Sequence, residues 1–352
     1  MNIQIKSLII ELNKLSCDSM LISNPESILC LTGINHTDGF IILGLNGEYT
    51  FFTSTLYEKA VKKNITSKVI IITGEISTQI VKEIKRLKFK KVGFESANLK
   101  YIKYKRLKEK INTTDITLVE TSDLIKNLNI IKTKEQINLI KKSVEISTEA
   151  FEYIKEISTP EMTEKDLSIE IEKFLRIKGD NDIAFNSIVA SGKNTIFPHH
   201  YPTNDQIGKS HCLIDIGSKY KGYCADLTRL IFYSKMSTLL KKVYNIIKKA
   251  QDLSIQKIKD GITAGEIDKI ARDYITKQGF GKYFIHGLGH GIGLSVHEAP
   301  YLQPNNKQVL KEGMVITIEP AIYFKNTFGV RLEDMVLVQQ KKGEILSEYG
   351  NR

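Results

Sequence analysis

The chain has 352 residues, which is enough for two domains with separate hydrophobic cores. Its 41% hydrophobic and 26% charged residues are typical of a soluble globular protein, and no apolar run approaches the length of a membrane span. The net charge of +11 is densest over residues 82–110, where the solvated faces of two helices explain it, so we expect neither nucleic-acid nor membrane partners.

The N-terminal third alternates short apolar runs with amphipathic stretches. Residues 1–15 carry apolar side chains at helical spacing and lack the features of a signal peptide, and the four cysteines are too scattered for a disulfide framework; we expect a cytoplasmic protein with reduced thiols. Strands are predicted at 20–23, 69–73 and 91–94, a hairpin over 39–53 that turns at Asn46-Gly47, and a helix near 76–87. This pattern predicts an α/β domain.

The pattern changes near residue 127, where we place the boundary between an N-terminal domain of residues 1–126 and a larger domain of residues 127–352. Apolar residues recur at helical spacing over 134–157, and a second helix begins with a capping box of Thr163 and Asp166. Two long hairpin-like segments, 211–233 and 313–339, follow further helices. The larger domain is therefore expected to consist of two α/β halves of similar plan, although their sequences show no close repeat.

Four carboxylates interrupt these two hairpin segments: Asp215 in LIDIG, Asp226 in YCADLTR, Glu319 in ITIEP and Glu333 in VRLEDMVLV. Their neighbours are Ile, Leu and Val, so the carboxylates should be buried, which costs several kcal/mol per ionised group unless it is compensated. Two carboxylates about 4 Å apart repel by roughly 4 kcal/mol at an effective dielectric constant near 20. Each pair flanks one turn and can lie across neighbouring antiparallel strands. If the four converge, they need cations.

Histidines add nitrogen ligands. In HGLGHGIGLSVHEAP, His286 and His290 are four residues apart, but the glycines disfavour a helix and no Glu follows His286, so we reject a zincin site. An extended strand or loop would place His290 at the metals and His297 across the substrate, with glycines that let the backbone approach closely. His199 and His200 form another pair ahead of the first hairpin segment. A carboxylate-rich shell with one imidazole suits Mn²⁺.

These motifs, in this order, resemble the pita-bread metallopeptidases: aminopeptidase P, prolidase and, more distantly, methionine aminopeptidase. The resembling segments are IKTKEQINLIKKSVEISTEAF, FNSIVASGKNTIFPHHYPTN, LIDIGSKYKGYCADLTR, HGLGHGIGLSVHEAP, EGMVITIEPAIY and GVRLEDMVLV. The segment CLTGINHTDGFIILGLNGEYTFFTSTLY resembles the N-terminal domain of bacterial Xaa-Pro peptidases, with Ser54 and Leu56 where that family often has charges. The resemblance implies an α+β homodimer with a C-terminal pita-bread (creatinase/aminopeptidase) fold preceded by a smaller α/β domain of the creatinase type.

The resemblance also implies a site. The five metal-ligand positions of the family are filled here by Asp215, Asp226, His290, Glu319 and Glu333. This set implies two divalent ions, Mn²⁺ by preference, with Co²⁺ or Zn²⁺ as alternatives. It argues against the metal-free creatinase branch and against the protein-binding relatives that have lost catalysis.

Other positions match family residues that contact the substrate. His199 matches a position near the scissile bond, and His297 matches one that stabilises the tetrahedral intermediate. His286 resembles a position that recognises the proline side, while Tyr323 and Arg331 resemble pocket positions. With Glu319 they form the expected catalytic and substrate-binding set.

We therefore expect hydrolysis of the N-terminal Xaa-Pro bond of proline-containing peptides, as in aminopeptidase P, or of dipeptides, as in prolidase. Methionine aminopeptidase is the alternative enzyme, but that branch typically has Gln-x-Glu-His around the last ligand, where this chain has RLED, and it lacks a large preceding domain. A non-catalytic interaction protein on the same fold is the alternative outside enzymes.

The resemblance suggests one hypothesis for the mechanism. Asp226 and Glu333 bridge the two ions, Asp215 binds one of them, and His290 and Glu319 bind the other. Glu319 also passes a proton to the departing proline nitrogen, which has no N–H of its own in the peptide bond. His297 stabilises the oxyanion.

Overall fold

The computed structural model describes residues 3–35, 38–180 and 182–347. The chain divides into two compact units, Met1–Asn129 and Ile130–Arg352, called here the N-terminal unit and the C-terminal unit. The division falls three residues later than the expected end of the first domain. The two units are described separately.

The N-terminal unit is built on one six-stranded sheet in the order β4-β3-β2-β1-β5-β6. Its elements are α1 (Ile3–Lys14), β1 (Ser19–Ile22), α2 (Pro25–Thr32), β2 (Gly39–Gly44), β3 (Tyr49–Thr53), α3 (Glu58–Asn64), β4 (Lys68–Ile71), α4 (Ile76–Arg86), β5 (Lys91–Phe94), α5 (Tyr101–Ile111), β6 (Thr117–Glu120) and α6 (Leu124–Asn129). The predicted strands, hairpin and helices are confirmed, with ends shifted by up to two residues. Elements α2, α3, β6 and α6 were not predicted.

Both faces of this sheet are buried, and the alternation of side chains along the strands explains how. Met20 and Ile22 of β1 pack with α1 and α2, whereas Leu21 between them packs with α4 and α5. The same alternation continues in β2, where all six residues are buried. The basic residues of α4 and α5 lie on the outer faces of helices that bury Ile80, Ile84 and their neighbours.

The C-terminal unit has two principal sheets, in the orders β11-β8-β7 and β13-β12-β14-β17-β18, and two short ladders, β10-β9 and β15-β16. Its elements are α7 (Lys134–Ile157), α8 (Glu164–Lys178), β7 (Ile188–Ser191), η1 (Gly192–Ile196), β8 (His211–Ile216), β9 (Lys219–Tyr220), β10 (Tyr223–Cys224), β11 (Leu227–Phe232), α9 (Thr238–Ile255), α10 (Ala264–Lys277), η2 (Gly281–Tyr283), β12 (Gly289–Gly291), β13 (Glu298–Leu302), β14 (Val315–Ile318), β15 (Ala321–Tyr323), β16 (Gly329–Arg331), β17 (Asp334–Val338) and β18 (Gly343–Ile345). The helix predicted over 134–157 is confirmed residue for residue.

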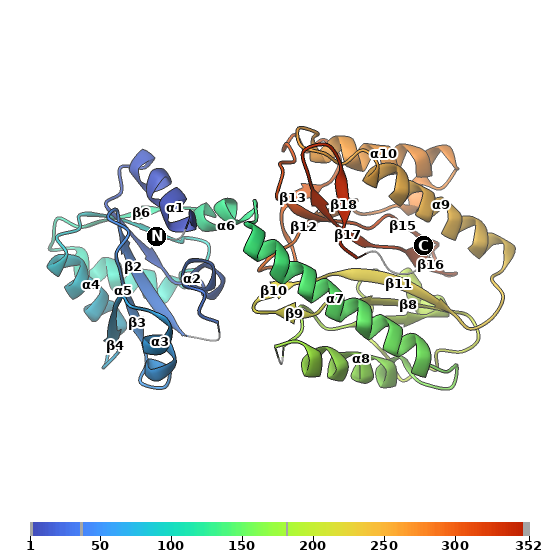
Figure 1. Cartoon of the computed structure of the whole chain (residues 1–352), viewed down its shortest axis with the longest axis horizontal. Coiled ribbons are helices and arrows are strands. Elements are labelled where there is room, and N and C mark those ends of the chain that lie inside the picture. Colours follow the sequence, from blue (N-terminus) through green and yellow to red (C-terminus); the bar gives the residue numbers. More distant parts are fainter. Residues whose placement is uncertain (1–2, 36–37, 181, 348–352) are drawn as a thin grey trace. The chain divides into compact units, whose positions relative to one another are not determined.

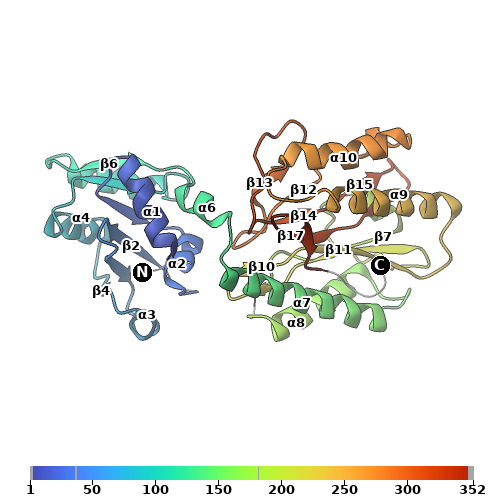
Figure 2. The same cartoon turned by 45° about the horizontal axis from the view of Figure 1, so that its top comes forward.

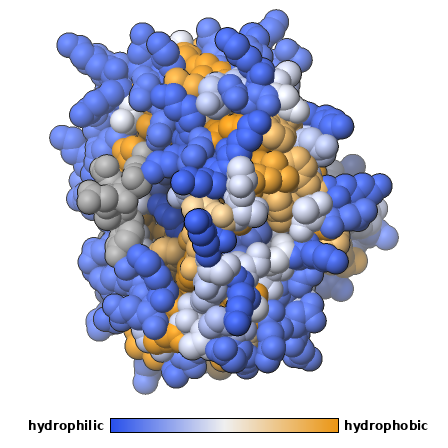
Figure 3. Space-filling model, turned by 90° about the vertical axis from the view of Figure 1, so that its right-hand side faces the viewer, coloured by the Kyte–Doolittle hydropathy of each residue, from blue (hydrophilic) through white to orange (hydrophobic). Residues whose placement is uncertain are grey.

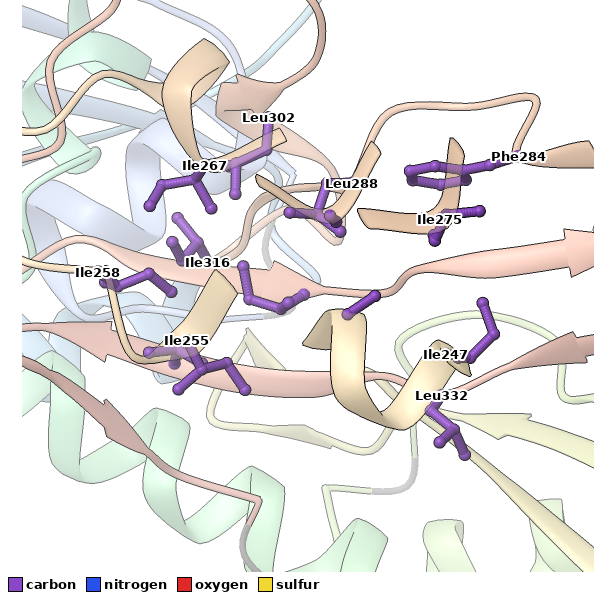
Figure 4. Close-up of a cluster of buried hydrophobic side chains, with 14 of the residues drawn as sticks. Ile247, Ile255, Ile258, Ile267, Ile275, Phe284, Leu288, Leu302, Ile316 and Leu332 are labelled. Atoms are coloured by element: carbon purple, nitrogen blue, oxygen red, sulfur yellow. The ribbon is translucent and has the colours of Figure 1, made fainter. Parts of the chain in front are cut away.

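Helices cover the outer sides of these sheets in two pairs. Helices α7 and α8 lie along β8 and β11, and α9 and α10 lie on the other side of the unit (Figures 1 and 2). One buried cluster joins α7 and α8 to the first sheet. A second joins α9 and α10 to the other, and includes Ile247, Ile267, Leu288 and Ile316 (Figure 4). The two sheets therefore meet in the middle of the unit, each backed by its own helices.

The two halves repeat the same main-chain arrangement where α8 and α10 begin. Each helix opens with a capping box that uses a threonine and an acidic residue. The amide of Glu164 donates to Asp205 O at 3.1 Å, and the amide of Ala264 donates to Gln308 O at 2.9 Å. The next amide donates to Thr203 O in the first half and to Asn306 O in the second, and the threonine before each helix, Thr163 or Thr263, forms an isolated β-bridge in both. The predicted similarity of plan is confirmed in the backbone.

Hydrophilic residues cover most of the face shown in Figure 3, with hydrophobic residues exposed in a patch near its middle. Within the described ranges, none of the helices combines the length and the apolar character that a membrane crossing requires.

Candidate metal centre

A cavity of about 650 Å³ opens in the C-terminal unit between its two principal sheets. The residues predicted to form the site line it, with one exception described below: Asp215, Asp226, His290, Glu319, Glu333, His199, His286, His297 and Arg331. The structure therefore brings together side chains that are up to 134 residues apart in the sequence.

Three of the four carboxylates lie where regular strand pairing is interrupted, and the fourth, Asp215, lies within a strand. Glu319 directly follows Ile318, and Glu333 directly precedes Asp334, the residue that pairs with Ile318. Both glutamates therefore lie between the β14-β17 ladder and the β15-β16 ladder. Asp215 stands within β8, directly opposite Thr228, whereas Asp226 precedes β11. Our expectation that Asp215 and Asp226 lie directly across a hairpin is therefore wrong by two residues. They approach each other diagonally instead, a separation that side chains can still span.

The core of the site is a cluster of Asp226, His290 and Glu333. Each offers a ligand atom within 4.8 Å of the atoms offered by the other two, and all three residues are buried. His290 Nε2 lies 3.8 Å from Asp226 Oδ2 and 3.4 Å from Glu319 Oε1. Such atoms are close enough to bind one cation together.

The carboxylates repel one another in the absence of a cation. Burial raises the pKa of Asp226 well above its ordinary value, and the charges of Glu333, Asp215 and Glu319 add to the rise. Burial likewise raises the pKa of Glu333. The pKa of Glu319 rises to about 8, first through burial, with Arg331 opposing the rise and Asp215 adding to it.

Two oxygens of this cluster also lack partners. Asp215 Oδ1 and Asp226 Oδ1 are buried and accept no hydrogen bond within the described residues. A buried, unpaired carboxylate oxygen is costly, and a divalent cation would compensate both this cost and the mutual repulsion. The donor set of carboxylates with one imidazole thus fits divalent metal ions.

Glycines allow His290 to reach this crowded position. A Cβ on Gly289 would overlap Thr317 O, and one on Gly291 would overlap Ala299 O, so neither neighbour of His290 tolerates a side chain. The predicted extended strand is confirmed as β12. Burial and the nearby His297 lower the pKa of His290 to about 3, which leaves the imidazole neutral and able to bind a metal.

Arg331 is a buried link at the base of the cavity. Its guanidinium donates to Asp215 Oδ2 at 2.6 Å, to the Tyr323 hydroxyl at 2.8 Å and to Pro198 O at 3.0 Å. Tyr323 is the exception noted above: it does not line the cavity but stands behind it, 3.3 Å from His286 Nε2. Its contacts hold Arg331 and His286 in place.

The sequence did not identify the residues that hold His286. Arg272 of α10 donates to the main-chain oxygens of Phe284 and His286 at 3.1 and 2.7 Å, and Asp268, one turn earlier, binds its guanidinium at 2.8 Å. Asp268 also accepts from the amide of Leu288. An i, i+4 Asp-Arg pair on a helix looks like an ordinary surface pair in sequence; its contacts with a distant loop are visible only in the fold.

Comparison with known proteins agrees with this geometry. Residues 138–340 match the model of metallopeptidase family M24, and residues 4–131 match the creatinase/prolidase N-terminal domain. The chain is 34% identical to the Xaa-Pro dipeptidase of Pyrococcus furiosus over 334 residues, which covers 95% of this chain and 94% of that protein.

Solved structures are similar over the full length. An Xaa-Pro dipeptidase from Bacillus anthracis superposes with a TM-score of 0.93 at 35% identity, covering 99% of this chain and 98% of that one. An X-Pro aminopeptidase from Thermotoga maritima gives a TM-score of 0.91 at 29% identity, covering 97% of this chain and 99% of that one. The chain therefore belongs to metallopeptidase family M24 and, with its creatinase/prolidase N-terminal domain, to the pita-bread Xaa-Pro peptidases.

Proposed function

We propose that this metallopeptidase hydrolyses the peptide bond between an N-terminal residue and proline, in dipeptides and in longer peptides. The proposal rests on one observation above all, the convergence of Asp226, His290 and Glu333 in a cavity that Asp215 and Glu319 also line. Names of relatives support the substrate class, because both Xaa-Pro dipeptidases and an X-Pro aminopeptidase are similar over almost the whole chain.

We propose Mn²⁺ as the native metal, with Asp215, Asp226, His290, Glu319 and Glu333 as its ligands. A shell of carboxylate oxygens with a single imidazole suits Mn²⁺, whereas structural zinc sites are typically rich in thiolate and imidazole ligands. When bound, two divalent ions would lower the pKa of a shared water toward neutrality, so that a nucleophile is available at physiological pH.

The side chains of the cavity have separate tasks in this proposal. Glu319 takes a proton from the nucleophile at its carboxylate and gives it to the proline nitrogen, which cannot leave without one. His297, whose pKa is lowered by burial, donates a hydrogen bond to the developing oxyanion. His199 and His286 contact the substrate on either side of the scissile bond, and Arg331 orients Asp215.

The test is Mn²⁺- and Co²⁺-dependent release of the first residue from Ala-Pro, Arg-Pro-Pro, Met-Ala-Ser and Ala-Ala, followed by mass spectrometry. We expect turnover of the two proline substrates and at least about 100-fold slower cleavage of the others. An Asp226→Asn variant is the control for a contaminating peptidase. Preferential release of Met from Met-Ala-Ser would instead favour a methionine aminopeptidase, and no metal-dependent turnover of any substrate would contradict the peptidase assignment.

A further inference from the structure

Glu164 is a fully buried carboxylate that lies outside the metal cluster. It is the first residue of α8, and none of its side chain is exposed. Its Oε1 accepts hydrogen bonds from the Ser191 amide at 2.7 Å, the Ser191 hydroxyl at 3.0 Å and Asn194 Nδ2 at 3.0 Å. Its Oε2 lies 2.7 Å from His200 Nε2 and accepts from the Thr203 amide at 3.0 Å and the Thr203 hydroxyl at 2.9 Å.

These six contacts keep the group ionised despite its burial. Burial alone would raise the pKa of Glu164, but hydrogen bonds from Asn194, His200 and the main chain outweigh burial and hold the pKa below its ordinary value. Glu164 thus joins the end of β7 to the irregular segment 197–203. Strand β7 in turn pairs with β8, in which Asp215 lies opposite Ile188.

The start of α8 does not itself need this carboxylate. In the other half of the unit, the equivalent first residue of α10 is Ala264, which is also fully buried and makes the same main-chain hydrogen bond. Both helices are capped by their own capping boxes, with Asp166 in α8 and Glu266 in α10. The repeated backbone therefore accepts the methyl side chain of alanine at this position. The carboxylate of Glu164 must interact with a feature that only the first half contains.

What differs in the first half is the loop that carries His199 into the cavity. The loop is fixed on both sides of this residue: Arg331 binds the oxygen of Pro198, and Glu164 binds His200 and Thr203. His199 lies between these two anchors, is exposed, and lines the cavity. Its position thus depends on one anchor from the metal side and one from helix α8.

We propose that Glu164 is a positioning residue that holds His199 at the scissile bond through His200 and Thr203. This inference rests on the proposed function, in which His199 contacts the substrate. Glu164 touches no metal ligand, so its loss should leave metal binding unchanged and reduce turnover, mainly through kcat.

The central experiment compares Glu164→Gln with Asp166→Asn. Both substitutions remove one negative charge from the first turn of α8, but the hydrogen bonds of Asp166 go to Thr163 at the start of the helix and not to the segment 197–203. We expect Glu164→Gln to lower kcat for Ala-Pro about 10- to 100-fold with less than a threefold change in KM, since small displacements of a positioned group have effects of this size. The kcat of Asp166→Asn for Ala-Pro should stay within twofold of the wild-type value. The affinity for Mn²⁺, measured by calorimetry, should be equal in the wild type and both variants.

A double-mutant cycle with His199→Ala separates positioning from general destabilisation. If Glu164 acts through His199, Glu164→Gln should cost less than about threefold in the His199→Ala background, because the group it positions is already gone. An undiminished loss in that background would overturn the inference. Thr203→Val, which removes one hydroxyl and keeps Glu164, is the milder second variant should Glu164→Gln fail to fold; we expect a loss of roughly threefold to tenfold that also vanishes with His199→Ala.

Hydrogen exchange of the segment 197–204 gives a readout that needs no substrate. We expect exchange to accelerate about tenfold or more in Glu164→Gln, or in Thr203→Val if the first variant does not fold, and to remain unchanged in Asp166→Asn. Inactive wild-type protein on Xaa-Pro substrates would count against the proposed function alone. Unchanged exchange, or full activity of Glu164→Gln in an active enzyme, would count against the role of Glu164.

Discussion

Glu319 has a position that combines two roles, since its carboxylate lies 3.4 Å from His290 Nε2 and also 3.4 Å from the Thr317 hydroxyl. In the metal-free protein, burial raises the pKa of this carboxyl to about 8, with Arg331 opposing the rise and Asp215 adding to it. The proposed shuttle role rests on the position of the carboxylate beside His290.

Replacement of Glu319 by Gln should nearly abolish turnover. The amide cannot accept the proton, and loss of a general acid–base group typically costs 10²- to 10⁴-fold in rate. Turnover of Ala-Pro is to be measured with metal content determined in parallel, and Glu344→Gln on β18 serves as the control. Near-normal kcat in a metal-loaded Glu319→Gln protein would eliminate this assignment.

Replacement of Asp226 by Asn should have opposite effects on the metal-free and metal-loaded protein. Without metal it relieves repulsion by Glu333, Asp215 and Glu319, and we expect a gain of about 1–2 kcal/mol in the free energy of unfolding at pH 7. With metal it removes a proposed ligand, and Mn²⁺ affinity should fall more than about 100-fold.

Thermal unfolding with EDTA and with Mn²⁺ measures both effects of the Asp226 substitution. Asp273→Asn, on the outer face of α10, is the matched control and should change neither. A loss of stability in EDTA would show that the carboxylates do not repel one another as this structure indicates.

At the scale of elements, Glu83 joins a helix to two strands of the N-terminal unit. Its buried carboxylate on α4 accepts from Thr50 of β3 at 2.9 Å, Lys68 of β4 at 3.0 Å and Arg86 at 2.8 Å. These contacts lower the pKa of Glu83 to about 2, and the hydrogen bond from Arg86 is the largest cause. Lys68 and Thr50 also lower this pKa, whereas burial opposes the decrease.

Because the pKa of Glu83 is lower in the folded than in the unfolded chain, its contribution to stability is fully present above pH 4.5 and is lost as the pH falls toward 2. We expect Glu83→Gln to cost about 1–2 kcal/mol at pH 7, a modest value because both cations are half-exposed. The difference between wild type and Glu83→Gln in the free energy of unfolding, measured with urea, should shrink below pH 4.5. Glu109→Gln, at an exposed position of α5, is the control; a difference for Glu83→Gln that stays constant down to pH 3 would contradict the assignment.

The sequence predicted elements well where local pattern decides them. The spacing of apolar residues gave α7 to the residue, and Asn46-Gly47 located the hairpin of β2 and β3. It failed for β6 and for short α2, although Asn24 and Pro25 form a recognisable helix start. In β6 only Leu118 and Val119 are apolar, and neither is fully buried, so this strand has no distinctive run of apolar residues.

The site shows the same limit more sharply. The four carboxylates each lie among Ile, Leu or Val in the sequence, and no directly adjacent residue is a cation that would offset the cost of burying them. We therefore predicted that they converge on shared cations. The register could not be predicted, because the hairpin turns at Lys221 and Gly222, both with positive φ, and this turn pairs Asp215 with Thr228 instead of Asp226. Nor could Glu164, which in sequence resembles any acidic residue in the first turn of a helix; its partners are 27 to 39 residues away.

At the scale of the whole molecule, metal binding should stabilise the C-terminal unit as one body. Metal at 100 times its dissociation constant adds about 2.7 kcal/mol, which for a unit of this size raises Tm by roughly 5–10 °C. Differential scanning calorimetry with Mn²⁺ and with EDTA tests this, with Mg²⁺ as the control cation. Equal Tm values with Mn²⁺ and EDTA would contradict a Mn²⁺ site.

The division of the proposed metal ligands between two halves has a consequence for how the enzyme is made. Asp215 and Asp226 belong to the first half, while His290, Glu319 and Glu333 belong to the second. During translation, a nascent chain therefore cannot assemble the complete site until the ribosome has added Glu333. Binding of cations by all five proposed ligands would therefore require both halves of the unit to be present.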